Sequence, residues 1–252
     1  MPIADLILLI LLFFVTTAVG VVTGSNSLVT VPVMFQFGID PKVAVATNMF
    51  GLTFMAIGAT LPFLKQGAIN IKRLSPFVLL TVIGSGIGAV LVGLISTKAI
   101  PIIVSVSMIF VALFTLIKRS TGVGKTETVS SNSQIIAYIL TFLLGIYGGL
   151  YSGGYVTMLT ACYVAFLGMT FTEAVAGTKF INIFSSSIAT IIFMWQGLVD
   201  YRLGAILAVT MFIAAYVGAK TVTRINDLWL KRIFLATVLI LALKILIFDI
   251  LI

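Results

Sequence analysis

The chain carries one apolar pattern twice, and this duplication limits its possible folds more than any other feature. Thr47 stands early in one apolar run, and Thr178 stands at the matching place in a later run, about 130 residues further on. A similar spacing separates Gln66 from Gln196, each of which follows the run that contains the Thr. We therefore expect two similar halves built from the same succession of elements.

The composition indicates that lipid surrounds most of this chain. Hydrophobic residues make up 61% of the sequence, charged residues only 9%, and the mean hydropathy is +1.26. Such a chain has too little polar surface to cover a soluble globule. Most of its apolar runs suit a helix of about 20 residues that crosses about 30 Å of hydrocarbon. The runs cover residues 5–38, 43–63, 74–95, 98–118, 135–168, 172–195, 203–220 and 229–252. The predicted fold class is an all-α polytopic membrane protein.

Two of the runs are too long for a single crossing. Residues 5–38 and 135–168 would each form a helix of about 50 Å. The first run is interrupted by the small and polar residues 24–27 and by Pro32, and the second by the glycine-rich residues 148–154. We interpret each run as a broken helical hairpin that enters and leaves the membrane on one face. Each copy is then one hairpin plus three transmembrane helices, and this odd number of crossings makes the two copies inverted repeats.

The pattern predicts one transport domain in three segments. Residues 1–118 form membrane repeat 1, residues 119–134 form a linker, and residues 135–252 form the inverted membrane repeat 2. The linker is rich in Ser, Thr and Gly, which bury little apolar surface.

The basic residues predict the orientation in the membrane. Inverted copies place ten Lys and Arg residues on the face of the linker and three on the other face, whereas parallel copies give seven against six. Only the inverted arrangement satisfies the preference of basic residues for cytoplasmic loops, so we expect a cytoplasmic linker and both termini outside. The face of the linker carries Lys65, Lys72, Arg73, Lys118, Arg119, Lys125, Lys220, Arg224, Lys231 and Arg232, and the other face carries Lys42, Lys98 and Arg202.

Missing residue types exclude several kinds of chemistry. The chain has no His and a single Cys, Cys162, so disulfide frameworks, Cys/His metal sites and nucleophile–His pairs are absent. We predict no enzyme activity, no catalytic or metal-binding residues and no cofactor. The net charge of +8 is explained by cytoplasmic loops, and we expect no nucleic-acid partner. The first run lacks a basic flank, so we expect it to stay in the mature protein rather than act as a cleaved signal peptide.

The two interruptions are the predicted binding site. Polar backbone at membrane depth is tolerated around a cavity filled by water or ligand, and broken helices of this kind hold the substrate in repeat-built transporters. Amide, hydroxyl and N–H groups at the start of a half-helix favour an anion. The residues predicted to line the site from the interruptions are Ser25, Asn26, Ser27, Gly153, Gly154 and Tyr155.

Lys179 is the most informative single residue of the sequence. A cation about seven residues into an apolar span is expensive in lipid and usually faces the interior of the bundle. Asn182 and Ser186 follow on the same stripe, and Asn48 is the matching residue of the first copy. We place these residues, with Thr47 and Thr178, behind the interruptions. A snorkelling Lys179, or an ion pair with Glu173, is the structural alternative.

Four segments resemble one known family of transporters. They are NSLVTVP (residues 26–32), AVATNMF (44–50), GIYGGLYSGGYVT (145–157) and EAVAGTKFINIFSS (173–186), and they lie in both halves. Each looks like the corresponding part of the TauE/SafE sulfite and sulfoacetate exporters, although this chain has residues 25–27 where other members show consecutive glycines. The resemblance implies a bacterial or archaeal inner-membrane protein that moves small sulfur-containing anions.

The functional hypothesis is a secondary transporter that exports a small organosulfur anion such as sulfite, sulfoacetate or a related sulfonate. An interior-negative membrane drives anion exit. The alternatives are transport of another small organic anion such as a carboxylate, cation or metal transport, intramembrane catalysis, and a purely structural role. Expected partners are the anion and the lipid bilayer, and a homodimer is possible.

Overall fold

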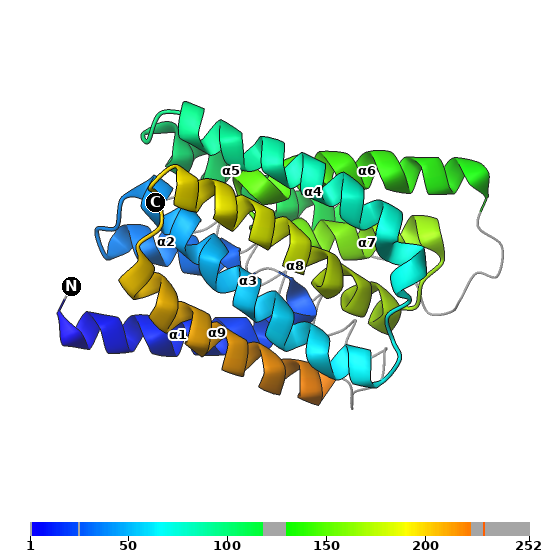
Figure 1. Cartoon of the computed structure of the whole chain (residues 1–252), viewed down its shortest axis with the longest axis horizontal. Helices are drawn as coiled ribbons and strands as arrows, with labels where there is room; N and C mark the ends of the chain where they lie inside the picture. Colours follow the sequence, from blue (N-terminus) through cyan, green and yellow to red (C-terminus); the bar gives the residue numbers. More distant parts are fainter. Residues whose placement is uncertain (1, 25, 118–129, 223–228, 230–252) are drawn as a thin grey trace.

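The computed structural model describes residues 2–24, 26–117, 130–222 and 229 of the chain. These residues form nine α-helices and no strand, which confirms the predicted all-α fold class. Figure 1 shows the helices packed as one bundle. Their bounds are α1 (Ile3–Thr23), α2 (Ser27–Gln36), α3 (Pro41–Lys65), α4 (Ile71–Leu94), α5 (Ala99–Ile117), α6 (Ser131–Leu150), α7 (Tyr155–Leu167), α8 (Phe171–Trp195) and α9 (Tyr201–Val222).

Local sequence signals set where the helices begin. The Asp40 side chain accepts hydrogen bonds from two backbone N–H groups of the first turn of α3, and Pro41 fits the position after this cap. At α8, Thr170 and Glu173 form a capping box in which each side chain accepts from the other residue's N–H group. The two central helices of the bundle therefore have well-defined starts.

Six helices in the described part of the chain are long and apolar enough to cross a membrane: α1, α3, α4, α6, α8 and α9. The spans predicted at residues 43–63, 74–95, 172–195 and 203–220 coincide with α3, α4, α8 and α9. Each hairpin is less symmetric than the sequence suggested, because α1 and α6 can span the membrane, whereas α2 has 10 residues and α7 has 13. The span predicted at 229–252 lies almost wholly outside the described residues.

The breaks in the hairpins lie within the segments where the sequence placed them, and both are shorter than predicted. The first break, between α1 and α2, includes Gly24 and Asn26, and the second covers residues 151–154. Pro32 lies inside α2 rather than ending it. Gly148 and Gly149 belong to α6, where the absence of a side chain allows close packing, so they do not form the second break.

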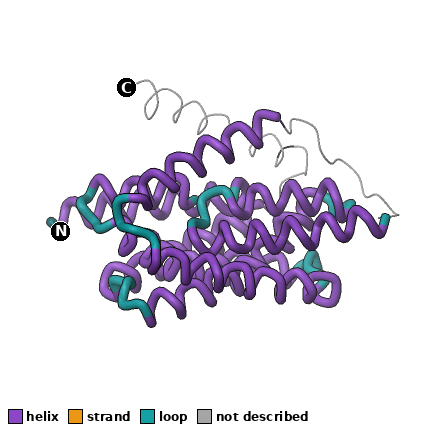
Figure 2. Tube along the Cα trace, turned by 90° about the horizontal axis from the view of Figure 1, so that it is seen from above, coloured by secondary structure: helices purple, strands orange, loops and turns teal. Residues whose placement is uncertain are grey.

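The two hairpins open toward opposite ends of the bundle. The start of α1 and the end of α2 line one cavity with the start of α9, and we name this side the first end. The second end is where α4, α6 and α8 begin, and there the Phe77 ring lies 4.7 Å from Tyr138 of α6 and 5.2 Å from Tyr163 of α7. In Figure 1 the first end is on the left and the second end on the right. Most of the loops lie at these two ends (Figure 2).

This arrangement supports inverted repeats, and the inversion of the complete copies stays a prediction. Helices α3 and α8 contact each other and run in opposite directions (Figure 1). Both have 25 residues, and they are the most buried of the six candidate spans. The first end carries Lys42, Lys98 and Arg202, and the second end carries Lys65, Lys72, Arg73 and Lys220. The other basic residues used to predict the orientation, and most of the predicted linker, lie outside the described residues.

Glycines bring α4 and α6 together across the interface between the copies. A Cβ atom on Gly88 would lie 2.0 Å from the backbone oxygen of Ile146, and one on Gly149 would lie 2.0 Å from that of Ser85. These positions therefore exclude any side chain. Gly86 differs, because a Cβ atom there would meet only side-chain carbons 3.8 Å away in the described part of the chain.

Candidate functional site

The two breaks meet inside the bundle, although 125 residues separate Ser27, which directly follows the first break, from Ser152 in the second. Gly24 ends α1 in the left-handed conformation with φ of 69°, and Gly154 precedes α7 with φ of 78°. The Ser27 and Ser152 hydroxyl oxygens lie 2.9 Å apart, and Tyr151 donates a 2.9 Å hydrogen bond to the Ser27 carbonyl oxygen. A polar contact between the two hairpins therefore occupies the place where the sequence predicts the site.

Asn48 ties the first break to the central helix α3. Its Nδ2 donates to the Ser27 hydroxyl at 3.0 Å, and its Oδ1 accepts from the Thr30 hydroxyl at 2.8 Å. The side chain is 2% exposed, so both ends of the amide are satisfied without bulk water. Asn48 thus fixes the start of α2, and its predicted role as a ligand stays a prediction.

Lys179 lies inside the protein and not at its surface. Its side chain is 2% exposed, and its Nζ donates a 3.0 Å hydrogen bond to the carbonyl oxygen of Gly20 in the last turn of α1. The negative end of the α1 dipole stabilises a cation there. The snorkelling alternative is therefore wrong in this structure. Glu173 serves in the capping box of α8, and the Lys179 ammonium bonds to α1 instead.

Buried oxygen atoms without a hydrogen-bond partner in the described structure lie on the elements around Lys179. Asn26 is 4% exposed and its Cβ packs 3.0 Å from the position of a Cβ on Gly20, the residue that Lys179 contacts. The Oδ1 atoms of Asn26 and Asn182 and the Oγ1 of Thr17 have no partner. Asn182 follows Lys179 by three residues on α8, and Thr17 precedes Gly20 by three on α1, so each lies on the same side of its helix. Buried acceptor atoms that have no donor beside a buried ammonium group indicate a site for a ligand or a water molecule.

The other predicted site residues are distributed as follows. Gly153 and Gly154 form part of the second break, the Gly153 carbonyl accepts from the Tyr147 hydroxyl, and Tyr155 begins α7 as a fully buried residue. Ser25 lies outside the described residues. The remaining three hydroxyl groups bond within the protein: Thr47 accepts from the Asp200 N–H at 3.0 Å, Thr178 contacts the Thr160 hydroxyl at 3.1 Å, and Ser186 donates to the Asn182 carbonyl at 2.6 Å. Their role as ligands stays a prediction.

Sequence reasoning missed Thr17, Thr30, Tyr151 and Ser152. Thr30 follows Ser27 by three residues on α2, and this spacing could have indicated a shared face. Tyr151 and Ser152 precede the glycine pair of the second break, and only the meeting of the hairpins reveals their contacts with Ser27. Thr17 lies within the first apolar run, and no feature of the sequence there pointed to a functional role.

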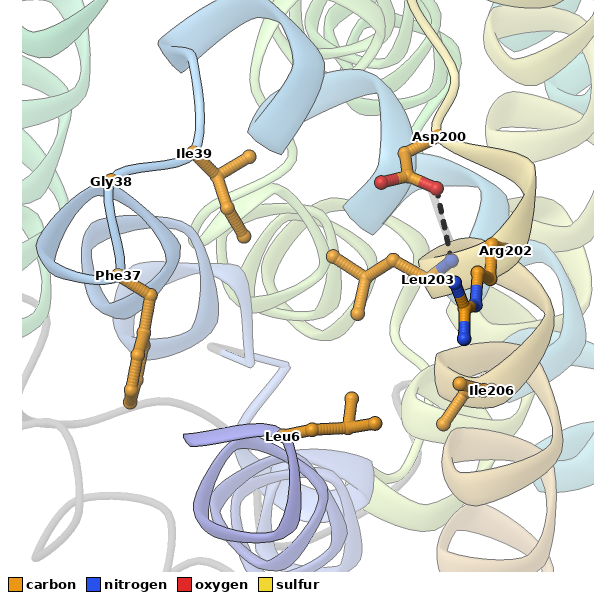
Figure 3. Close-up of a pocket in the computed structure, with 8 residues that line it drawn as sticks. All are labelled: Leu6, Phe37, Gly38, Ile39, Asp200, Arg202, Leu203 and Ile206. Atoms are coloured by element: carbon orange, nitrogen blue, oxygen red, sulfur yellow. Dashed lines mark hydrogen bonds between the residues drawn. The ribbon is translucent and has the colours of Figure 1, made fainter. Parts of the chain in front are cut away.

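A cavity of about 430 Å³ opens at the first end of the bundle (Figure 3). Asp200 and Arg202 bring opposite charges to it, and the Asp200 carboxylate accepts a 3.0 Å hydrogen bond from the Leu203 N–H. The Asp200 backbone N–H reaches Thr47, which precedes Asn48 on α3. The cavity is lined by Leu6, Phe37, Gly38, Ile39, Asp200, Arg202, Leu203 and Ile206.

The described residues contain no group of three or more His, Cys, Asp or Glu side chains that could hold a metal ion. The buried charge in the described part of the chain is instead positive, because Lys179 is the one Lys, Arg, Asp or Glu among its buried residues.

Comparisons with known proteins agree with this architecture. The family model described as sulfite exporter TauE/SafE matches residues 8–245. A probable membrane transporter protein of Sinorhizobium is 26% identical over 211 residues, which cover 82% of this chain and 79% of the relative. One from Haemophilus influenzae is 24% identical, covering 83% of this chain and 82% of the relative, and the probable membrane transporter protein YfcA of Escherichia coli K12 is 25% identical, covering 86% and 81%.

No solved structure showed a significant match to this chain. The family match includes most of α1 and the whole of the other five candidate membrane spans, and the relatives share most of their length with the chain. The chain is therefore a multi-pass membrane protein that belongs to the sulfite exporter TauE/SafE family of membrane transporters.

Proposed function

We propose that this protein is a secondary transporter that exports a small organosulfur anion, such as sulfite, sulfoacetate or a related sulfonate, across the bacterial or archaeal inner membrane. The observation that carries the proposal is the position of Lys179, a buried cation beside the meeting point of two broken hairpins. The sulfur chemistry of the substrate is inferred from the family, the sulfite exporter TauE/SafE family.

The charge of Lys179 favours an anionic substrate. Burying an ammonium group costs several kcal/mol unless an opposite charge or several hydrogen bonds compensate it. In the described structure its Nζ makes a hydrogen bond to one carbonyl oxygen, and no other Lys, Arg, Asp or Glu is buried in that part of the chain. A bound anion would supply the missing charge.

The membrane potential gives the direction. An interior-negative potential favours the exit of an anion by about 2.3 kcal/mol per charge per 100 mV, so export needs no coupled ion. If the second end faces the cytoplasm, the cavity at the first end opens to the outside of the cell. The Ser27–Ser152 contact then closes the path between the cytoplasm and this cavity.

Flux measurements on the purified protein in liposomes test this function. We expect efflux of sulfite or a sulfonate that accelerates when the potassium gradient and valinomycin make the lumen more negative. Empty liposomes and acetate are the controls. Transport of carboxylates without any sulfur-containing anion would refute the proposed substrate. A flux of cations would refute the assignment as an anion transporter.

A cross-link between the two breaks tests whether they must separate during transport. In a Cys162→Ala background, Ser27→Cys with Ser152→Cys places two thiols where the hydroxyl oxygens lie 2.9 Å apart. Oxidation should stop the flux and reduction should restore it, because the bond holds the copies in the closed arrangement. Each single substitution is the control. Undiminished flux through a fully cross-linked protein, verified by mass spectrometry, would show that the path lies elsewhere.

A further inference from the structure

The unpartnered oxygen atoms around Lys179 carry information about the substrate that the charge alone does not. Among the six buried side-chain atoms without a partner in the described structure, three lie on the elements next to Lys179: Thr17 Oγ1, Asn26 Oδ1 and Asn182 Oδ1. Amide oxygens accept hydrogen bonds and cannot donate them. They are therefore unsuited to contact the oxygen atoms of a fully deprotonated anion.

The orientation of the Asn26 amide follows from its neighbour. Its Nδ2 lies 3.7 Å from the Met55 thioether sulfur, which is a weak acceptor and has no proton to donate. The opposite orientation would direct the amide oxygen at that sulfur, so the oxygen is the atom left without a partner. With 4% of the side chain exposed, bulk water does not reach it freely.

The number of buried charged side chains limits the net charge of the substrate. Lys179 is the one buried Lys, Arg, Asp or Glu in the described part of the chain. One ammonium compensates one negative charge, and a second negative charge in the same place would be left without a partner, which is strongly unfavourable at low dielectric constant.

We propose that the substrate is a monovalent oxyanion that also carries at least one O–H donor, such as hydrogensulfite or a hydroxyalkyl sulfonate. Its anionic oxygen atoms contact the Lys179 ammonium, and its donor contacts the amide oxygen of Asn26 or Asn182. The inference rests on the proposed export function and narrows its substrate class. Dianions such as sulfoacetate, which has neither the single charge nor the donor, fall outside the preferred class.

Three matched probes test the inference on the unmodified protein. The compounds 2-hydroxyethanesulfonate and ethanesulfonate differ by one hydroxyl group, and 1,2-ethanedisulfonate adds a second charge. Flux into liposomes and the thermal shift of the purified protein are measured for each. We expect the hydroxylated monoanion to be preferred over ethanesulfonate by at least about tenfold, which corresponds to about 1.4 kcal/mol, since ethanesulfonate would leave the buried acceptor without a donor. The disulfonate should be the poorest of the three.

Amide variants locate the source of the preference. Asn26→Leu and Asn182→Leu remove the acceptors, and we expect at least one of them to bring the ratio of the two monoanions close to one. Gln196→Leu is the matched control, because Gln196 also has a buried amide oxygen without a partner in the described structure but lies just after α8, beside Gly93 of α4. It should keep the ratio of the unmodified protein.

The outcomes separate this inference from the proposed function. Equal transport of the two monoanions, or preference for the disulfonate, overturns the inference and leaves sulfonate export intact. If none of the three probes nor sulfite binds or moves, the proposed function fails and the inference fails with it. If the ratio persists in both Asn variants, the donor is recognised elsewhere, by a buried water or by another residue, and the assignment to these amides is wrong.

Discussion

Replacing Lys179 with methionine is expected to abolish anion transport while leaving the protein at least as stable as the parent. The transport rate should fall by about 100-fold or more, because truncating one partner of a buried charge contact costs about 2–5 kcal/mol. Stability should move in the opposite direction, since methionine fills a similar volume without the cost of burying a charge. The Gly20 carbonyl keeps a partner, as it also accepts from the Gly24 N–H at 2.8 Å. Flux in liposomes and thermal unfolding in detergent measure the two effects.

The matched control is Lys65→Met, which removes an exposed lysine from the last turn of α3. It should change neither flux nor unfolding temperature appreciably, since isolated surface charges contribute little. A Lys179→Met protein that transports at the parental rate would overturn the assignment of Lys179. A strongly destabilised variant would show that the ammonium has a structural role.

Gly88→Ala is expected to be, with Gly149→Ala, among the most damaging single-methyl additions in the described part of the chain. The added Cβ would lie 2.0 Å from the Ile146 backbone oxygen and 2.7 Å from the Leu150 backbone nitrogen, so α4 and α6 must move apart. Overpacking usually costs about 1–3 kcal/mol, and a clash with the backbone of α6, which cannot rotate away as a side chain can, should reach or exceed the top of this range. The yield of monodisperse protein and its unfolding temperature should both drop sharply.

Gly86→Ala is the control two residues away on the same helix. Its new Cβ would meet only the side-chain carbons of Ile188 and Ile192 at 3.8 Å, which is ordinary contact. The alanine should be neutral or should stabilise α4 by about 0.5–1 kcal/mol through its higher helix propensity. Equal effects of the two substitutions would contradict the α4–α6 packing.

The fold was largely predictable because lipid leaves few choices. A backbone in hydrocarbon must satisfy its own hydrogen bonds, so long apolar runs predict helices, and their lengths predict which of them can cross. The exact breaks were harder to place. Pro32 stays within α2, and Gly149 serves packing against Ser85 within α6, because a neighbouring helix decides whether a glycine or proline breaks a helix or fills a contact.

The sequence predicted several residues of the candidate site, but it did not predict which atoms they contact. Polar residues in apolar runs singled out Asn48 and Lys179, and the structure places both in the interior. The sequence could not show that Lys179 reaches Gly20 across the two copies, nor that Thr47 faces Asp200 instead of a break. Such contacts depend on the angle and depth at which the helices cross.

The sequence by itself determined that this chain is a helical membrane protein, since hydrophobicity and helix length act along the chain and need no partner, and it predicts two similar copies. Only the tertiary structure decided that the first and second breaks touch, that Ser27 meets Ser152, and that the Asn26 and Asn182 oxygens lack partners in the described structure. The physical reason is that hydrogen bonds act over about 3 Å, and residues far apart in the sequence come that close only after the helices have packed.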